Sequence, residues 1–538
     1  MKFAERPYFC TMASVKIHRQ KTGLFSELAN QLVYNQDKLK DFIQEPFSLD
    51  AFENQMKLKS EQYSSENRKV LHEVLVSKYN KYTSTSEQKH NLEQLSKENT
   101  FTITTGHQLS LLTGPLYFVI KILHAVKLAK ELSDKYPEGN FVPLFWMGSE
   151  DHDFKEINQV NLFNQKFAWE TEQTGAVGRF TMENWTTFID QIKGLFANHQ
   201  DAEIHDLLDT YKGNNLTEAT FKLVNTLFGK DGVIVLDGDD ERLKSIFVPV
   251  IKKELTENLS FHAVTKTNAE LEKAGLETQA FAREINIFLL KKGSRERIQY
   301  ENGIYFTDAG TRYTKEEILS YLRSNPGEFS PNVILRPMYQ ETILPNLCYI
   351  GGGGEIAYWL QLKGVFEAYG VQYPLIQVRN SLLLIDTGTS KKMEAVGWLA
   401  EQLFEDVDAL KKKYVLENAE ELDLTEMRKA QNDLIETCRN LVKAVDSNLS
   451  AYVEAEMTRL TKQLDNLEEK LIRTEKSKYK KPLKQMDQIR DKLFPNNGLQ
   501  ERNVNFFNFC SDGEVRAHLD KIKSVIDPFE KDFIVLYL

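Results

Sequence analysis

The sequence predicts an α/β protein built on a doubly wound parallel sheet and followed by a long helical region. Short apolar runs rich in β-branched and aromatic residues alternate with amphipathic segments through the centre of the chain. Glycine and proline then nearly vanish between residues 391 and 482, where Glu, Lys, Leu and Gln dominate. A chain of 538 residues exceeds one typical domain, so we expect more than one structural unit.

The first hundred residues are polar and have a helical pattern of apolar residues, as in Val70-Leu71 and Val74-Leu75. They contain no motif that indicates chemistry. We therefore expect a mainly helical segment over residues 1–100 that packs on the core.

The core, expected over residues 101–385, begins with a strand, a helix and a second strand. FTITT starts at Phe101, and the apolar run FVPLFWM occupies 141–147. Between them a helical pattern begins near Pro115, which we expect in the first helical turn because its missing N–H needs no partner there. The order strand, helix, strand implies a parallel crossover unit.

Further strands are expected where short apolar runs occur among the later amphipathic segments. These runs lie at 232–237, 332–337, 347–350, 373–379 and 533–538. Insertions at about 155–230 and 240–330 are expected to interrupt the core. The last strand belongs to a return segment, 501–538, that we expect to pack on the core.

A helical coiled-coil domain is expected over residues 386–500. Its apolar residues step by 4, 3, 4, 3 and 4 positions, which is a heptad pattern. They are Val453, Met457, Leu460, Leu464, Leu467 and Leu471. Self-association into a homodimer through this seam is the favoured interpretation, and an intramolecular hairpin with the helix before Asp446 is the alternative.

Composition excludes several classes of function. Lys and Arg total 68 against 78 Asp and Glu, so neither nucleic acid nor an anionic membrane is an expected partner. The 4 cysteines are far apart without a CxxC pair, which predicts neither a zinc knuckle nor a disulfide framework and favours a reducing cytoplasm. No run approaches the roughly 18 apolar residues that a membrane helix needs.

Two polar clusters follow the first two core strands. His107 and Gln108 come after one strand, and the run Glu150, Asp151, His152 and Asp153 comes after the next. Because ligands bind outside the carboxyl ends of parallel strands, both clusters should lie at one rim of the sheet. The acidic run could supply a general base and an amine-binding carboxylate, and no metal is expected because ligation would need further ligands. The alternative is an acidic cap, in which Asp153 accepts N–H bonds from the following helix.

A second candidate site is the glycine run Gly351, Gly352, Gly353 and Gly354, followed by Glu355. Bare backbone N–H groups there could bind an anion such as phosphate or carboxylate, or the run could be a tight loop packed against the sheet. It matches neither GxGxxG nor a P-loop. Arg336, and Arg379 followed by Asn380, are the cations best placed to grip an anion bidentately, although either arginine could instead form an ion pair.

Four blocks of this sequence resemble, in the same order, the bacillithiol biosynthesis cysteine-adding enzymes. They are TTGHQLSLLTGPLYFVIK (104–121), VPLFWMGSEDHDFKEINQV (142–160), GGGGEIAYWLQLKGVFE (351–367) and VRNS (378–381). The resemblance implies a Rossmann-like core with connecting-peptide insertions and an added coiled coil that forms dimers. It also implies a cytoplasmic ligase that joins cysteine to the amino group of glucosaminyl-malate, the last step of bacillithiol biosynthesis.

Site residues carry over from this resemblance position by position. The matching positions are Gly106, Gln108, Gly114, Pro115, Glu150, Asp151, His152, Asp153, Glu355, Tyr358 and Arg379. His107 is a departure, because glutamine often follows this glycine in the family.

Roles for these residues follow as hypotheses from the implied amide-forming reaction. A free carboxylate must be activated, so we expect ATP, with Mg only as its counter-ion and the amides of 351–354 as phosphate donors. Asp151 or His152 would deprotonate the incoming amine, and Arg336 or Arg379 would hold the malyl carboxylates. The alternatives are an adenylating ligase that acts on a different amine, and a non-catalytic coiled-coil dimer with a nucleotide-binding-type fold.

Overall fold

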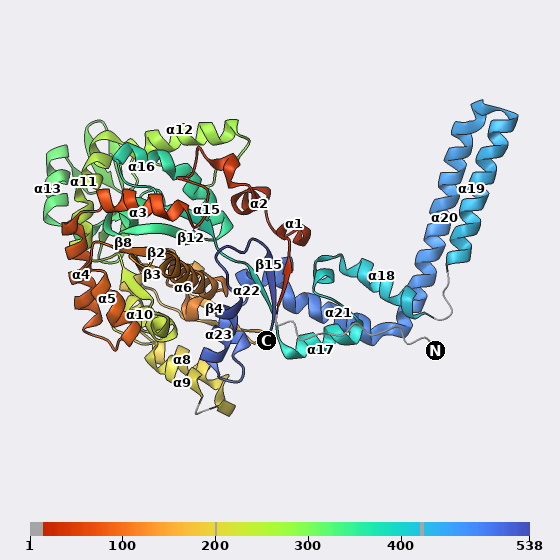
Figure 1. Cartoon of the computed structure of the whole chain (residues 1–538), viewed down its shortest axis with the longest axis horizontal. Helices are drawn as coiled ribbons and strands as arrows, with labels where there is room; N and C mark the ends of the chain where they lie inside the picture. The colour runs from red at the N-terminus through yellow and green to blue at the C-terminus, as the bar shows by residue number, and fades with distance from the viewer. Residues whose placement is uncertain (1–13, 200–201, 420–423) are drawn as a thin grey trace. The chain divides into compact units, whose positions relative to one another are not determined.

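The computed structural model describes residues 14–199, 202–419 and 424–538. The chain divides into two compact units (Figure 1). The first, which we call the core unit, comprises 16–383 and 500–536, and the second, the helical unit, comprises the described residues of 384–499 with 14–15 and 537–538.

The core unit is organised around a five-stranded sheet with the order β13-β12-β2-β3-β6, in which every neighbouring pair is parallel. Its strands are β2 (Thr100–Gln108), β3 (Asn140–Gly148), β6 (Ile234–Asp237), β12 (Asn346–Gly351) and β13 (Leu375–Val378). The α/β fold class and these five strands are confirmed. These strands are buried on both faces, as is usual for a parallel sheet, and their runs are nearly continuously apolar except in β2, where buried threonines alternate with Phe101 and Ile103.

Helix α6 (Tyr117–Lys135) makes the crossover from β2 to β3 and lies over both strands (Figure 1). Its residues Ala125, Leu128 and Leu132 are buried against Ile103 of β2. Pro115, expected in the first helical turn, instead precedes the helix. There it forms an antiparallel bridge with Asn505, while the N–H of Leu116 donates to the Val504 carbonyl at 2.7 Å.

The strand predicted at 332–337 is wrong. Strand β11 (Phe329–Pro331) ends before it, and helix α14 (Arg336–Ile343) begins inside it. The Oδ1 atom of Asn332 accepts the Ile334 N–H at 2.9 Å, which turns the chain, and Pro337 suits the first helical turn. Two further strands bear on the predictions: β15 (Phe533–Tyr537) confirms the one expected at 533–538, whereas β14 (Leu382–Ile385) was not predicted.

The N-terminal part of the core unit is mainly helical, as its composition predicts. After β1 (Ser14–Ile17) it forms α1 (Arg19–Thr22), α2 (Glu27–Tyr34), α3 (Ala51–Gln62), α4 (Ser65–Tyr79) and α5 (Ser86–Gln94). Phe52 of α3 is fully buried in one cluster with Ile103 and Leu347 of the central sheet.

Two segments interrupt the order of sheet strands. Between β3 and β6 lie α7 (Phe154–Ile157), β4 (Gln159–Leu162), β5 (Gln165–Ala168), α8 (Trp185–Gly194), α9 (Glu203–Thr210) and α10 (Leu216–Phe228). Between β6 and β12 lie α11 (Glu241–Glu257), α12 (Leu259–Lys273), β7 (Ile287–Lys291), β8 (Ser294–Glu301), β9 (Ile304–Thr307), β10 (Arg312–Tyr313), α13 (Lys315–Ser324), β11 and α14. Strands β7 to β11 form an antiparallel sheet with the order β10-β9-β8-β7-β11, which we call the inserted sheet. After β12 the core unit continues with α15 (Gly353–Trp359) and α16 (Lys363–Tyr369), and later with α22 (Gln500–Asn503) and α23 (Val515–Val525).

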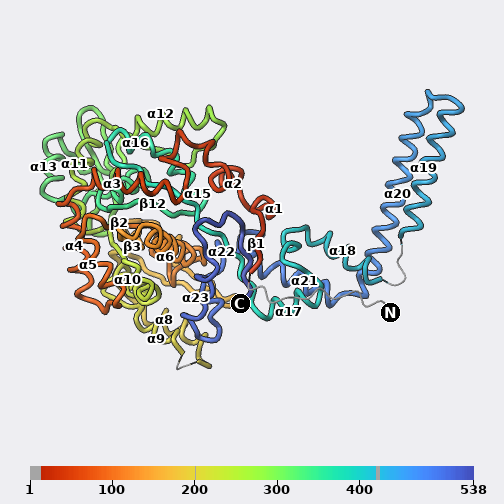
Figure 2. The backbone as a smooth tube through the Cα atoms, in the orientation of Figure 1, coloured from red at the N-terminus to blue at the C-terminus, as the bar shows by residue number. Residues whose placement is uncertain are grey.

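The helical unit contains the predicted coiled coil as a hairpin. Its helices are α17 (Thr387–Val396), α18 (Val407–Asn418), α19 (Thr425–Val445), α20 (Ser450–Lys476) and α21 (Lys480–Leu493). Helices α19 and α20 run side by side from a shared tip (Figure 2). Ion pairs Arg439–Glu454 at 2.6 Å and Arg428–Asp465 at 2.8 Å join them, so the two helices form an intramolecular hairpin, and self-association through it stays a prediction.

Toward the C-terminal end of α20, the residues predicted to form the heptad seam are exposed, and their neighbours are buried instead. Glu468 and Ile472 are buried, whereas Leu467 and Leu471 remain 46% and 39% exposed. A straight helix has 3.6 residues per turn, so a strict 3.5-residue pattern drifts around its surface over successive turns. None of the described helices has the length and apolar content required to cross a membrane.

Candidate functional site

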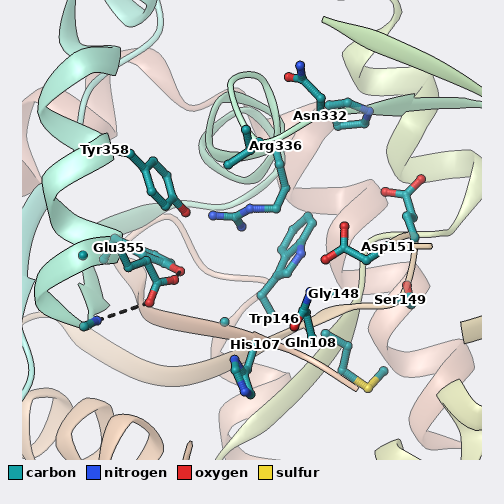
Figure 3. A pocket seen from close by; sticks show the side chains of 18 of the residues that line it. His107, Gln108, Trp146, Gly148, Ser149, Asp151, Asn332, Arg336, Glu355 and Tyr358 are labelled. Atoms are coloured by element: carbon teal, nitrogen blue, oxygen red, sulfur yellow. Dashed lines mark hydrogen bonds between the residues drawn. The ribbon is translucent and has the colours of Figure 1, made fainter. Parts of the chain in front are cut away.

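A cavity of about 870 Å³ opens in the core unit beyond the carboxyl ends of β2, β3 and β12 (Figure 3). The predicted residues that line it are Gly106, His107, Gln108, Glu150, Asp151, Arg336, Gly352, Gly353, Gly354, Glu355, Tyr358 and Arg379. Those that do not line it are Gly114, Pro115, His152, Asp153, Gly351 and Asn380. The parallel topology therefore brings the two polar clusters and the glycine run to one rim.

Glu355 is the centre of a polar cluster at this rim. Its Oε2 atom lies 2.7 Å from Lys121 Nζ and accepts the Gly352 N–H at 3.2 Å, while its Oε1 accepts the Tyr349 hydroxyl. Burial raises the pKa of Glu355, but the charge and hydrogen bond of Lys121, with the Tyr349 hydroxyl and the charge of Arg336, together outweigh burial, and the net pKa is lowered. The Glu355 carboxylate is therefore held ionised, with 23% of its side chain exposed at the cavity.

Arg336 and Tyr358 face each other near Glu355 (Figure 3). The Arg336 guanidinium lies 5.7 Å from the centroid of the Tyr349 ring, and its Nη1 donates to Gln340 Oε1 at 3.1 Å. Within the described part of the chain, Arg336 forms no ion pair with a carboxylate. Burial raises the pKa of Tyr358 to about 12, so its hydroxyl stays protonated and can donate a hydrogen bond.

Arg379 has a structural partner, unlike Arg336. Its Nη2 lies 2.9 Å from Glu501 Oε1 and its Nη1 donates to the Asn380 carbonyl at 2.8 Å. Both side chains of the Arg379–Glu501 pair are buried, with 5% and 1% exposed. Asn380 lies behind it, where its N–H donates to His124 Nδ1 at 3.2 Å. The ion-pair alternative for Arg379 is therefore what the structure shows, and Asn380 lies outside the cavity.

The acidic run after β3 splits into residues with different surroundings. Glu150 forms an ion pair with Lys244 at 2.6 Å, and Lys244 also contacts Asp239 at 2.8 Å. The Asp151 side chain is 44% exposed at the cavity, 3.6 Å from Arg295. His152 is exposed, with its Nδ1 3.3 Å from Arg295 Nη1. Asp151 is thus the acid of this run with both access to the cavity and a loosely held carboxylate.

Asp153 does not cap the following helix. It precedes α7, but its side chain accepts no N–H from the first turn. The acidic-cap alternative is therefore wrong. Asp153 is exposed, and its backbone (φ −84°, ψ 79°) does not have the extended conformation usual for a capping residue.

His107 packs against the start of α6. Its ring centroid lies 5.2 Å from that of Tyr117 and 5.4 Å from that of Phe118. In Figure 3 the ring points away from Glu355 and Arg336. Burial lowers the pKa of His107 to about 3, so the imidazole is neutral near pH 7. The expected role of its side chain in binding substrate is therefore not supported, although the residue reaches the cavity edge.

The glycine run divides between packing and the cavity. Gly351 ends β12, where it pairs with Val378 of β13 and its carbonyl accepts the Arg379 N–H at 2.9 Å. The N–H of Gly352 is already used by Glu355. Gly353 and Gly354 begin α15 and line the cavity. Of the four backbone N–H groups expected to bind an anion, those of Gly353 and Gly354 are therefore the candidates, because Gly351 belongs to the sheet and Gly352 binds Glu355.

Several lining residues were missed by sequence reasoning. They are Tyr117, Lys121, Trp146, Arg283, Arg295, Arg297, Asn332 and Arg502. A signal existed for Lys121, since a lysine inside the apolar face of α6 must have a buried partner. Arg295 and Arg297 lie two residues apart on β8 and so share a face of the strand. They were missed because a strand with this many charged residues is expected to face solvent.

Comparison with known proteins gives matches along nearly the whole chain. The family described as bacillithiol biosynthesis BshC, N-terminal Rossmann-like domain, matches residues 12–380, and its C-terminal coiled-coil domain matches 382–538. A Flavobacterium johnsoniae protein named "Putative cysteine ligase BshC" is 40% identical, with 97% of this chain and 99% of that protein covered. Proteins of the same name from Flavobacterium psychrophilum (39% identical; 97% and 98% covered) and Christiangramia forsetii (37%; 96% and 97%) are also similar.

Proposed function

The chain belongs to the bacillithiol biosynthesis BshC family, and on this premise we propose that it is a ligase that adds cysteine to glucosaminyl-malate. The bond formed is an amide between the cysteine carboxyl carbon and the amino nitrogen of the sugar, which would complete bacillithiol. Relatives 37% to 40% identical over nearly their full length carry the name of a cysteine ligase.

One observation supports this chemistry above the others. A loosely held carboxylate, Asp151, and an arginine without a carboxylate partner, Arg336, line the same cavity. The ammonium group of the amino sugar must lose a proton before its nitrogen can attack, and Asp151 is the proposed acceptor of that proton. Arg336 would hold a malyl carboxylate bidentately, and the neutral Tyr358 hydroxyl would donate a further hydrogen bond.

ATP is the proposed activator of the cysteine carboxyl, with Mg as its counter-ion. ATP would turn one cysteine carboxylate oxygen into part of a phosphate leaving group, because oxide or hydroxide leaves poorly. The carboxyl C–O bond to that group would break as the C–N bond forms. Gly353 and Gly354, at the start of α15, are the backbone donors best placed to hold its phosphates. The neighbouring Gly351 is not given this role, because it belongs to the sheet and does not line the cavity.

A homodimer through the coiled coil is part of the proposal. The α19–α20 hairpin leaves large apolar side chains at solvent near its tip, namely Leu434, Leu441, Val445, Leu449 and Tyr452, which are 46% to 79% exposed. A second copy of the hairpin would cover them, since exposed apolar stripes on coiled-coil helices are typical of helix association. We place the enzyme in the cytoplasm, whose reducing conditions keep the thiols of substrate and product free.

The proposal is tested by mass spectrometry of the product. Purified protein is incubated with glucosaminyl-malate and cysteine, with and without Mg-ATP, and bacillithiol is measured. Product that forms only with Mg-ATP supports the ligase and its activator. No product under either condition would contradict a self-sufficient ligase, and a different amine that outcompetes glucosaminyl-malate would redirect the substrate assignment.

A further inference from the structure

The inserted sheet contributes one wall of the cavity, and that wall is rich in arginine. Arg283 precedes β7, whereas Arg295 and Arg297 lie on β8, and all three line the cavity together with Asn332. Asn332 and Asp151 lie to the right of Arg336 in Figure 3, whereas Tyr358 and Glu355 lie to its left. The inserted sheet and the glycine run belong to different elements, and both line the cavity.

Arg295 is built into this wall. Its side chain is only 6% exposed, and its guanidinium lies 4.2 Å from the Phe288 ring centroid. The Nη2 group donates to the Pro331 carbonyl at 3.0 Å and to Ser330 Oγ at 3.3 Å. Such fixed contacts hold a cation in one place, which lowers the entropy cost of binding an anion beside it.

Arg283 is held by its backbone and leaves its charge unpaired. Its N–H donates to Asn286 Oδ1 at 2.9 Å, and the fully buried Asn286 side chain donates to Ser260 Oγ at 2.7 Å. In the described residues, the Arg283 guanidinium forms no ion pair with a carboxylate. Arg297 pairs with Asp308 at 3.4 Å, and that aspartate also accepts a hydrogen bond from Gln299.

On the other side of the cavity two cations are paired with carboxylates, whereas Arg336 has no such partner in the described residues. Lys121 is paired with Glu355 at 2.7 Å, and Arg379 is paired with Glu501 at 2.9 Å. On the inserted wall three guanidinium groups face two carboxylates, Asp151 and Asp308, at 3.6 Å and 3.4 Å. The wall thus keeps a net positive charge in a confined space, where electrostatic attraction is stronger than in bulk water.

We propose that Arg283, Arg295 and Arg297 form an oxyanion subsite on the inserted wall, separate from Arg336. The subsite rests on the proposed function, and its ligand there is a carboxylate of the malyl group. Asp151 borders the subsite, so an anion bound there brings its own molecule next to the proposed base. The malyl group and the amine occupy neighbouring carbons of the sugar, so a malyl carboxylate on this wall places the amine near Asp151. Phosphate is also an oxyanion, so it is the alternative ligand of this subsite that the experiment must distinguish.

Binding measurements on the full chain test this subsite. Isothermal titration calorimetry gives the Kd of each probe for the wild type, Arg283→Gln and Arg297→Gln. The probes are glucosaminyl-malate, glucosamine and inorganic pyrophosphate. Arg312→Gln on β10 is the matched control, because it removes the same charge from the same sheet at an exposed position outside the cavity. We expect the Kd for glucosaminyl-malate to rise about tenfold to a hundredfold in both variants, with glucosamine binding and the control unchanged.

Other outcomes distinguish a malyl ligand from a phosphate, and a failure of the subsite from a failure of the proposed function. Loss of pyrophosphate binding with unchanged glucosaminyl-malate binding would overturn the malyl assignment in favour of a phosphate. Kd values equal to those of Arg312→Gln for every probe would overturn the subsite itself. A wild type that binds glucosaminyl-malate through these arginines but makes no bacillithiol would contradict the proposed function alone. Circular dichroism of each variant verifies that it is folded.

Discussion

Lys121 Nζ lies 2.7 Å from Glu355 Oε2 and also donates to the Gly106 carbonyl, so one buried ammonium joins helix α6, strand β2 and the start of α15. The Lys121 side chain is 3% exposed, and burial lowers its pKa although Glu355 opposes that shift. The pair places a fixed, internally neutral cluster at the rim of the cavity. It is therefore a structural support of the site as much as part of its lining.

Removal of one member of this pair should destabilise the fold. Lys121→Met leaves the partly buried Glu355 carboxylate, 23% exposed, without its cation, and we expect the free energy of unfolding to fall by about 1–3 kcal/mol. The double variant Lys121→Met/Glu355→Gln should recover part of that loss, because no uncompensated charge then remains. Urea unfolding followed by circular dichroism measures both. A single variant as stable as the wild type would show that the pair contributes little.

His107 should make stability depend on pH. Its folded pKa of about 3 lies below the ordinary value of 6.5, so between these values the unfolded chain binds a proton that the folded chain does not. Stability contributed by the neutral imidazole is therefore present above about pH 6.5 and is lost as pH falls toward 3. His107→Gln should flatten the decline in unfolding free energy over this window. His90→Gln, at an exposed position of α5, is the control. Equal slopes for wild type and His107→Gln would refute the prediction.

Among the acidic residues at 150–153, Asp151 should be the one on which turnover depends. Asp151→Asn removes the proposed proton acceptor, and we expect kcat to fall by about 10²–10⁴-fold with the fold intact. Asp153→Asn is the matched control, since Asp153 is exposed, does not line the cavity and caps no helix. Bacillithiol formation by mass spectrometry gives the rates. If Asp151→Asn and Glu355→Gln both retain full activity while folded and dimeric, the site assignment is wrong.

The exposed apolar residues of the hairpin should control the oligomeric state. Leu441 and Val445 are 60% and 79% exposed, so a charge at either position should not disturb the α19–α20 contact. We expect Leu441→Asp/Val445→Asp to be monomeric by light scattering at concentrations where the wild type is dimeric. Leu399→Asp, exposed in the same unit outside the hairpin, should remain dimeric. An unchanged mass for the double variant would place the interface elsewhere.

Local pattern determined much of the fold. Five buried strands, the parallel crossover through α6 and the helical region were all predicted from apolar runs, because a strand buried on both faces needs a nearly continuous apolar sequence. The run at 332–337 has the same local pattern but forms a turn and a helix, since Asn332 and Pro337 favour those conformations. Apolar pattern alone could not separate the two cases.

The same division holds for the candidate site. The rim that gathers Gln108, Asp151 and Glu355 follows from parallel topology, which the sequence already implied. Which charges remain available there was decided only by tertiary structure: Arg379 is cancelled by Glu501, more than a hundred residues away in the chain, while Arg336 is not cancelled. The arginines of the inserted wall reach the cavity from a separate sheet. Sequence therefore determines local backbone preference and burial, whereas the pairing of charges depends on distances between segments that only the folded chain brings together.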